Sequence, residues 1–230
     1  MTGEVLLSAK GLDAGYNGQA IVSGVDLDLR AGEMIGVFGA NGAGKTTTVL
    51  TLAGSQRAVA GELTLLGAAH PGSLYKAARS GLALLTDDRS IFAPLSVRDN
   101  LRLGRGGVEA ALQIFPELRE HVDRRAGLLS GGQQQMLSVG RILAARPRVI
   151  LADELSLGLA PLIVKRLLAA LRAAADDGAA VLIVEQHVPV ALAMVDTAVV
   201  LARGTVALSA PAAELRDDPH AISDLYLASA

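Results

Sequence analysis

The chain has 230 residues, of which 51% are hydrophobic and 19% are charged, so its length fits one large domain or two small ones. Lys and Arg number 21 against 23 Asp and Glu, and the formal net charge of −2 argues against the broad positive field that drives nonspecific binding to nucleic acid. There is no cysteine, which excludes disulfides, thiolate metal sites and a thiol nucleophile. We therefore expect a globular protein without a nucleic-acid partner.

The apolar segments are too short for a membrane span. A long apolar stretch, residues 188–202, is broken by Pro189 and Asp196, whereas a spanning helix needs about 20 apolar residues. Near the N-terminus an acid, Glu4, stands where a signal peptide would carry basic residues. These features favour a cytoplasmic protein that does not cross the membrane.

Short aliphatic runs without polar alternation are typical of strands that are buried on both faces. Four such runs occur, at residues 34–38, 149–152, 181–184 and 198–201. They predict a mostly parallel central sheet. The first third of the chain differs, because residues 25–30 alternate between apolar and polar side chains and residues 63–66 lie close to glycines. This part predicts additional antiparallel strands.

Between residues 89 and 145 the strand signals give way to helical ones. Apolar residues recur at i, i+3 and i+4 within three segments, at residues 97–103, 108–115 and 133–145. Glycines at 104–107 and 127–132 are expected to form turns between them. The predicted fold class is therefore α/β, a single domain over 1–230 in which a helical subdomain (89–145) is inserted into a core made of 1–88 and 146–230.

Residues 39–46 read Gly-Ala-Asn-Gly-Ala-Gly-Lys-Thr and match the pattern G-x-x-x-x-G-K-[ST]. They follow the aliphatic run at 34–38 and precede a helical pattern at 47–53, which is the context that a phosphate-binding loop requires. The glycines let backbone N–H groups converge on an anion, and the following helix adds its N-terminal dipole. We expect Lys45 to contact the β- and γ-phosphates and Thr46 to bind Mg²⁺. The alternative, a glycine-rich loop that only joins strand to helix, fits this placement poorly.

Two adjacent acids, Asp153 and Glu154, follow the aliphatic run at 149–152. Carboxylates at the end of a buried strand need a cation or a water to hold them. Together with the phosphate loop, they predict that Asp153 binds Mg²⁺ and that Glu154 orients and polarises the attacking water. Without that loop, the pair would be interpreted as surface acids.

Residues 129–133 read Leu-Ser-Gly-Gly-Gln and precede a helical pattern. A Ser-Gly-Gly turn that opens a helix can bind phosphate through a hydroxyl, backbone N–H groups and the helix dipole. Alone it would be an ordinary helix N-cap. In this order with the phosphate loop and the acid pair, nearly the whole chain resembles the ABC-type ATPase family. The resemblance implies a P-loop NTPase core, ATP and Mg²⁺ as cofactors, and ATP hydrolysis.

The resemblance also implies which residues bind nucleotide. They are Gly39, Asn41, Gly42, Ala43, Gly44, Lys45, Thr46 and Thr47 in the phosphate loop, and Ser130, Gly131, Gly132 and Gln133 in the second motif. In this family two ATPase subunits form a head-to-tail dimer around two ATP molecules, so the second motif acts on the partner's nucleotide. The partner is expected to be a second copy of this chain or a paralogous subunit.

Single positions extend the resemblance or depart from it. Tyr16 stands where the family stacks an aromatic ring on adenine, although a packing tyrosine is a comparable interpretation. His187 matches the switch histidine that contacts the γ-phosphate, and we interpret it as the end of a buried strand. Asp87 replaces a glutamine that senses Mg²⁺; it can bind the metal but cannot donate a hydrogen bond. Leu155 replaces the proline that usually follows the catalytic acid. The remaining histidines are expected to be inert: His70, His121 and His220.

Residues 156–164 and 41–48 are similar to segments in the ATPase subunits of branched-chain amino acid importers, and the compact length together with residues 185–186 favours the shorter of the two such subunits. That likeness implies two separate membrane permeases, an extracytoplasmic substrate-binding protein and a place on the inner face of the cell membrane. Leucine, isoleucine and valine would be the cargo, with urea, short amides or other amino acids left open.

A permease loop is expected to dock near residues 88–104. The apolar candidates for that contact are Ile91, Phe92, Pro94, Leu95 and Val97, of which Phe92 is preferred because large aromatics anchor interfaces. Each of them is equally well interpreted as a core residue of the subdomain, because apolar side chains usually pack inside. Two other functions stay open. One is a soluble ABC ATPase without a membrane partner, and the other is a weakly hydrolysing regulatory subunit, which the departures at Asp87 and Leu155 suggest.

Overall fold

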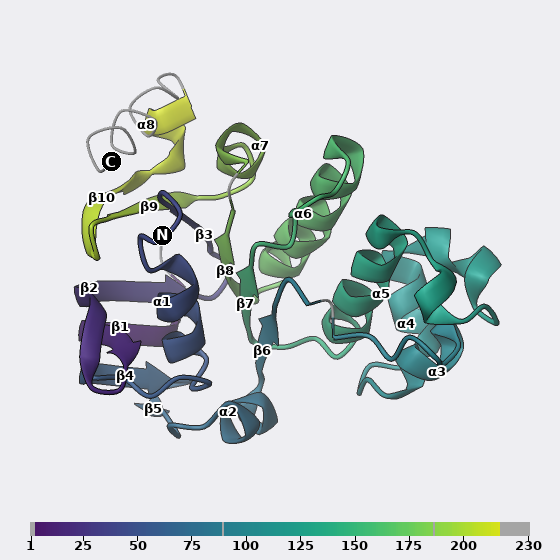
Figure 1. Cartoon of the computed structure of the whole chain (residues 1–230), viewed down its shortest axis with the longest axis horizontal. Coiled ribbons are helices and arrows are strands. Elements are labelled where there is room, and N and C mark those ends of the chain that lie inside the picture. The colour runs from purple at the N-terminus through teal and green to yellow at the C-terminus, as the bar shows by residue number, and fades with distance from the viewer. Residues whose placement is uncertain (1–2, 89, 186, 217–230) are drawn as a thin grey trace.

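A computed structural model describes residues 3–88, 90–185 and 187–216 (Figure 1). Its centre is a six-stranded sheet in the order β10-β9-β3-β8-β7-β6, in which neighbouring strands run parallel except for β10 and β9. The strands are β3 (Met34–Phe38), β6 (Leu82–Leu85), β7 (Val149–Asp153), β8 (Ala180–Val184), β9 (Thr197–Ala202) and β10 (Thr205–Pro211). Every residue of β3, β7 and β8 is buried, which explains their unbroken aliphatic runs and confirms the predicted sheet.

The first third of the chain forms a second, antiparallel sheet in the order β2-β1-β4-β5. Its strands are β1 (Val5–Tyr16), β2 (Gln19–Arg30), β4 (Ala60–Leu65) and β5 (Ala68–Ala69). The expected alternation holds in β2, where Val25, Leu27 and Leu29 are buried while Asp26 is exposed. The prediction of antiparallel strands at this edge of the fold is confirmed.

Helices flank the two sheets and form a separate group at one end of the molecule (Figure 1). Those that accompany the sheets are α1 (Lys45–Leu52), α2 (Leu74–Ser80), α6 (Pro161–Asp176), α7 (Val188–Leu192) and α8 (Ala212–Arg216). The group between β6 and β7 contains α3 (Val97–Arg102), α4 (Val108–Ile114), α5 (Gly131–Leu143) and two 3₁₀ turns, η1 (Pro116–His121) and η2 (Ala126–Leu128). The expected helices are present, but Gly131 and Gly132 begin α5 and do not form a turn, because Ser130 caps the helix.

Two hydrophobic clusters lie on opposite faces of the central sheet. Along β7, Ile150 belongs to the cluster that also contains Leu137 and Phe115 of the helical group, whereas Leu151 belongs to the cluster under the antiparallel sheet. The period-2 alternation of strand side chains therefore attaches both accessory parts to the same core. Val97 is fully buried in the first cluster, so its prediction as a docking residue is wrong. In the described residues no helix is long and apolar enough to cross a membrane.

Candidate functional site

The phosphate loop connects the end of β3 to the start of α1. Gly44 is the N-cap of α1 and has a φ of 96°, and a Cβ on it would lie 2.0 Å from Cγ2 of Val22. Gly39 has a φ of 152°, and its Cβ would lie 2.4 Å from the carbonyl oxygen of Leu201. Both positions therefore require glycine, for backbone conformation and for space. Within the part of the chain that the structure describes, no side chain caps α1, so ligand groups can reach its first N–H groups.

Lys45 is buried at the centre of the loop. Its Nζ donates hydrogen bonds to the carbonyl oxygens of Gly39 (2.9 Å) and Ala40 (3.0 Å) and lies 3.9 Å from Oε1 of Glu154. Burial lowers the pKa of Lys45, while the carboxylates of Glu154 and Asp153 act in the opposite direction. The ammonium group is thus held at the bottom of the loop, near the carboxylates of Asp153 and Glu154.

A pocket of about 540 Å³ opens beside this loop. Its lining includes the expected residues Asn41, Gly42, Gly44, Lys45, Thr46, Thr47 and Glu154, together with Ile21 and Leu157. Ile21 and Leu157 were not predicted. Ile21 lies in the strand that follows Tyr16, and Leu157 lies in the loop that follows Glu154, so both are large apolar residues close to a predicted site residue. Tyr16 ends β1 with 43% of its surface exposed and is not among the described residues that line the pocket.

Asp153 is the last residue of β7 and is buried beside Thr46. Burial raises the pKa of Asp153, and a hydrogen bond from Thr46 offsets part of that shift. The exposed Asp87, in the loop after β6, is close enough to raise it as well. Among the described residues, Oδ1 of Asp153 has no hydrogen-bond partner. A buried, unsatisfied carboxylate oxygen beside a hydroxyl is the donor set that Mg²⁺ takes from a protein, so the residues present fit this ion.

Glu154 follows β7 directly and adopts a left-handed conformation with a φ of 49°. Such a conformation costs a non-glycine residue about 1–2 kcal/mol and needs support from its surroundings. Here the N–H of Glu154 donates to the carbonyl oxygen of Val184 in β8 (3.0 Å). This bond anchors the turn that presents the carboxylate to the pocket.

His187 lies three residues beyond the end of β8, so its interpretation as the end of a buried strand is wrong. It is exposed at the N-cap of α7, with Nδ1 3.2 Å from Oγ of Ser156. The same hydroxyl donates to Oε2 of Glu185. Neither Ser156 nor Glu185 was predicted to belong to the site, and Gln186 lies outside the described residues.

The second motif begins α5 within the helical group. Ser130 and Gln133 form a reciprocal capping box, in which the N–H of Gln133 donates to Oγ of Ser130 (3.3 Å) and the N–H of Ser130 donates to Oε1 of Gln133 (3.0 Å). Nε2 of Gln133 is also 2.8 Å from Nε2 of His121, so this histidine supports the side chain of the cap. None of residues 130–133 is among the described residues that line the pocket at the phosphate loop.

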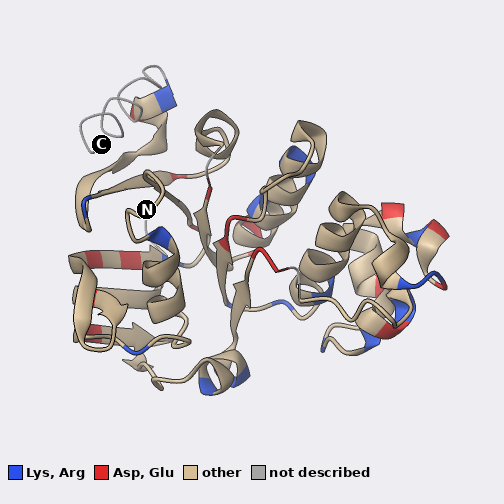
Figure 2. Cartoon of the chain, viewed as in Figure 1, with Lys and Arg blue, Asp and Glu red and all other residues tan. Residues whose placement is uncertain are grey.

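Acidic residues gather at the edge of the central sheet where this site lies (Figure 2). Acidic segments follow β6, β7 and β8, whose carboxyl ends adjoin in the parallel sheet (Figure 2).

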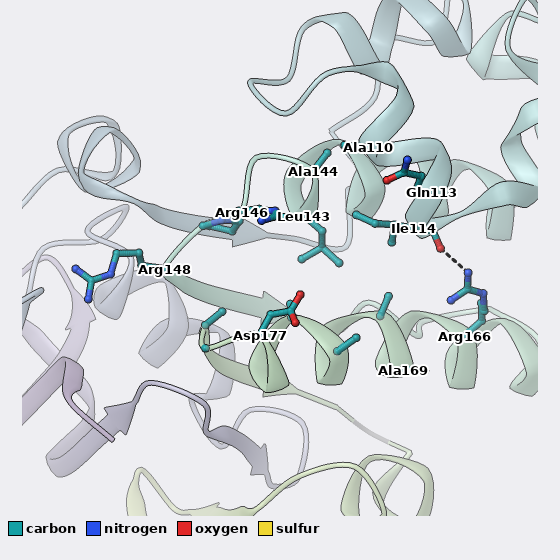
Figure 3. Close-up of a pocket in the computed structure, with 16 residues that line it drawn as sticks. Ala110, Gln113, Ile114, Leu143, Ala144, Arg146, Arg148, Arg166, Ala169 and Asp177 are labelled. Carbon is teal, nitrogen blue, oxygen red and sulfur yellow. Dashed lines mark hydrogen bonds between the residues drawn. The ribbon is translucent and has the colours of Figure 1, made fainter. Parts of the chain in front are cut away.

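A larger cavity of about 810 Å³ lies elsewhere, between α4 and the end of α5 on one side and the alanine-rich α6 on the other (Figure 3). Two of its arginines already have partners, since Arg166 donates to the carbonyl oxygen of Ile114 and Arg148 pairs with Glu4.

Known proteins resemble this chain across most of its length. A family model described as ABC transporter matches residues 22–156, more than half of the chain. The high-affinity branched-chain amino acid transport ATP-binding protein BraG of Pseudomonas aeruginosa is 35% identical, covering 88% of this chain and 91% of BraG. A probable branched-chain amino acid transport ATP-binding protein, LivF of Archaeoglobus fulgidus, is 34% identical over 89% and 91%. The lipopolysaccharide export system ATP-binding protein LptB of Escherichia coli is 33% identical over 96% of both chains.

Solved structures share the fold at lower identity. A nucleotide-free ATP-binding cassette from an ABC transporter has a TM-score of 0.83 at 20% identity and covers 97% of this chain and 99% of its own. A dimeric ATP-binding cassette bound to ADP and Pi has a TM-score of 0.76 at 21% identity over 90% and 99%. Fold, family model and relatives agree with the phosphate loop described above: the chain belongs to the ABC transporter family and is an ATP-binding ATPase subunit of a transporter.

Proposed function

We propose that this chain hydrolyses ATP to drive uptake of branched-chain or related amino acids through separate permease subunits, bound to the inner face of the cell membrane. The observation that supports ATP hydrolysis is that Lys45, Asp153 and Glu154 lie close together beside a pocket formed by the phosphate loop. The likeness to BraG and LivF supports the choice of cargo. In this proposal residues 89–145 form a helical subdomain, and 1–88 with 146–230 form the nucleotide-binding core.

The chemistry follows from the position of each side chain. We assign Gly39, Asn41, Gly42, Ala43, Gly44 and Thr47 to binding of the phosphates through the loop. The Lys45 ammonium exchanges its two loop carbonyls for β- and γ-phosphate oxygens, which are stronger acceptors because they are charged. Mg²⁺, which would neutralise phosphate charge when bound, would be held by Thr46 and Asp153, with Asp87 at the edge of the same site.

Water activation is assigned to Glu154 and His187. The Glu154 carboxylate borders the pocket and accepts a proton or hydrogen bond from the attacking water. The His187 ring, at the start of α7, would approach the γ-phosphate from the adjacent strand end. Tyr16, exposed near the hairpin that also presents Ile21, would supply an aromatic face for adenine.

Closure of the site requires a second subunit. The pocket is open, and Leu157 at its rim has 55% of its surface exposed. Residues 130–133 lie at the start of α5 and do not line that pocket. We therefore propose that the nucleotide is covered by the same four residues of a second copy or a paralogue: Ser130, Gly131, Gly132 and Gln133. The existence of a dimeric ATP-binding cassette with the same fold supports this arrangement.

The Glu154→Gln variant tests hydrolysis and dimerisation together. An amide can still accept a hydrogen bond but cannot take up a proton, so the variant should bind ATP and stall before cleavage. Light scattering with Mg²⁺ and ATP should then show a stable dimer, and the wild type should return to monomer as ATP is consumed. A variant that binds ATP but stays monomeric would contradict the composite site.

Phe92 is the proposed contact for a permease loop. The residue is 52% exposed, and its backbone is held by the buried Asn100, which accepts from the Phe92 N–H (2.8 Å) and donates to the Phe92 carbonyl oxygen (3.0 Å). The guanidinium of Arg141 lies 5.9 Å from the ring centroid. A fixed backbone with an outward aromatic ring is suited to anchor a partner. Pro94 and Leu95 are also exposed nearby.

The Phe92→Ser variant tests that contact. Its basal ATPase activity as an isolated subunit should equal that of the wild type, because the ring does not line the nucleotide pocket. Co-purification with the permeases and stimulation by cargo should be weakened. Normal assembly and stimulation would remove Phe92 from the interface, and loss of basal activity would assign it a structural role.

Export is the second candidate, because LptB matches this chain over nearly its full length. The two functions differ in their permeases and in the direction of transport. Reconstitution of this chain in vesicles with candidate permeases and a candidate binding protein should give ATP-dependent accumulation of labelled leucine, isoleucine or valine on the side of the membrane where the ATPase is bound. Accumulation of none of these, with ATP-dependent extraction of a lipid, would favour export.

A further inference from the structure

A buried acid that the proposed chemistry does not use lies behind the catalytic turn. Glu185 follows β8 and is 2% exposed, and its Oε2 accepts the hydroxyl hydrogen of Ser156, which is also buried. Burial of a carboxylate is costly unless strong donors satisfy it. The pair is 29 residues apart in the chain, so the fold brings these two side chains together.

The hydroxyl of Ser156 joins this acid to His187. Its Oγ is 3.2 Å from Nδ1 of His187, and a serine hydroxyl has one hydrogen to donate. Because that hydrogen is directed to Glu185, Oγ can interact with the ring nitrogen as an acceptor. Nδ1 of His187 must then carry a hydrogen, and in the neutral ring Nε2 has the free lone pair.

We propose that Glu185 is a positioning residue that acts through Ser156 to hold His187 in the Nδ1–H tautomer, with Nε2 free for the reaction. This inference rests on the proposed role of His187 at the γ-phosphate. It adds a direction to that role: neutral His187 accepts a hydrogen bond from the attacking water through Nε2 and so orients it, while the proton that the water loses goes to Glu154.

The pair Ser156 and Glu185 also connects His187 to Glu154, the proposed catalytic acid. Ser156 lies two residues after Glu154, and the N–H of Glu154 is bonded to the carbonyl oxygen of Val184, the residue before Glu185. Two hydrogen bonds therefore join the turn after β7 to the end of β8. One is the backbone bond from Glu154 to Val184, and the other is the side-chain bond from Ser156 to Glu185. Displacement of Ser156 would move the carboxylate of Glu154 and the ring of His187 together.

Nitrogen NMR measures the tautomer without any enzymatic turnover. We would label the full-length chain with ¹⁵N-histidine, record long-range ¹H–¹⁵N correlations without nucleotide at a pH where the rings are neutral, and assign His187 by its loss in His187→Gln. The wild type should show His187 with hydrogen on Nδ1. Ser156→Ala should return the ring to the Nε2–H form that free imidazole favours. An Nε2–H ring in the wild type would overturn the inference, because it would mean that the hydrogen-bond chain runs in the reverse direction.

Kinetics separates the hydrogen bond from general packing. Glu185→Gln keeps an oxygen that can accept from Ser156, so it should retain the Nδ1–H tautomer and most of the turnover. Glu185→Leu removes the acceptor and should lower kcat by about tenfold while KM for ATP stays within about twofold. Equal tautomers and equal kcat in the two variants would overturn the inference. If His187→Gln hydrolyses ATP at the wild-type rate while the wild-type tautomer is Nδ1–H, the role of His187 fails and the positioning by Glu185 stands.

Discussion

The helices α1 and α5 both begin at a motif that we expect to meet phosphate, but their N-termini are satisfied in different ways. At α1 the N-cap is Gly44, which has no side chain, and no side chain of the described residues caps the helix. At α5 the N-cap is Ser130, and the capping box with Gln133 already satisfies the backbone N–H groups of both residues. The first helix is therefore open to a ligand, whereas the second is stable without one.

This difference indicates how the two motifs divide their work. The α1 N-terminus, with Lys45 beneath it, has donors available for a nucleotide held by one subunit. At α5, Oγ of Ser130 accepts the N–H of Gln133 and still has its own hydrogen to donate. A capped helix with one free hydroxyl is suited to add a contact to a phosphate that is already bound elsewhere. The variants below test this division.

Lys45→Ala should have the largest effect, because it removes the charged donor from the open helix. Without the ammonium group, the γ-phosphate loses its charge-assisted contact, and turnover should fall by about 100-fold or more. Steady-state ATPase assays of the purified variant with Mg²⁺ measure this, with circular dichroism as the control for folding. A folded variant with the wild-type rate would show that the phosphate loop is wrongly assigned.

Ser130→Arg should abolish turnover while a single subunit still binds ATP, because the bulky charge blocks the composite site and leaves the pocket at Lys45 intact. Ser130→Gly is the matched control: glycine is tolerated at an N-cap for a few tenths of a kcal/mol, but it has no hydroxyl. We expect it to lose about tenfold in turnover through the missing donor. Titration with a fluorescent ATP analogue measures binding. Parallel losses of binding and turnover would place the motif at its own subunit's nucleotide.

Gly44→Ala should destabilise the fold at the open helix. A left-handed alanine costs about 1–2 kcal/mol, and its overlap with Val22 adds about 1–3 kcal/mol. Gly67→Ala is the control, since Gly67 has a φ of 77° and nothing within 4 Å of an added Cβ. Urea unfolding of both variants should show the larger loss at Gly44. Equal losses would mean that Val22 moves aside freely.

Gln133→Ala should have the smallest effect. It removes the acceptor for the Ser130 N–H and the contact with His121, which should cost about 1 kcal/mol of unfolding free energy and lower Tm by about 2–4 °C. Gln133→Glu keeps an acceptor for that N–H and should lie closer to the wild type in differential scanning calorimetry. An unchanged Tm in Gln133→Ala would mean that the α5 N-terminus does not depend on its capping box.

The sequence predicted those parts of the fold and site that depend on local chemistry. The phosphate loop was recognisable because its glycines, lysine and threonine must stand at fixed positions within eight residues to surround a phosphate. The strands β3, β7 and β8 were recognisable because burial on both faces leaves no polar alternation. The sequence left open whether Val97 docks a partner or packs in the core, since apolar residues 91–97 look alike until neighbouring helices cover some of them.

Contacts between distant residues were decided by the tertiary structure. The hydroxyl of Ser156 reaches Glu185 and His187 because β7 and β8 are adjacent in the sheet, and no pattern within either segment predicts that pairing. His121 reaches Gln133 because η1 packs beside the start of α5. The sequence by itself therefore determined which groups we assign to the binding and cleavage of a phosphate. The fold alone determined which neighbours hold those groups in place, because a side-chain hydrogen bond depends on distance in space and not on separation along the chain.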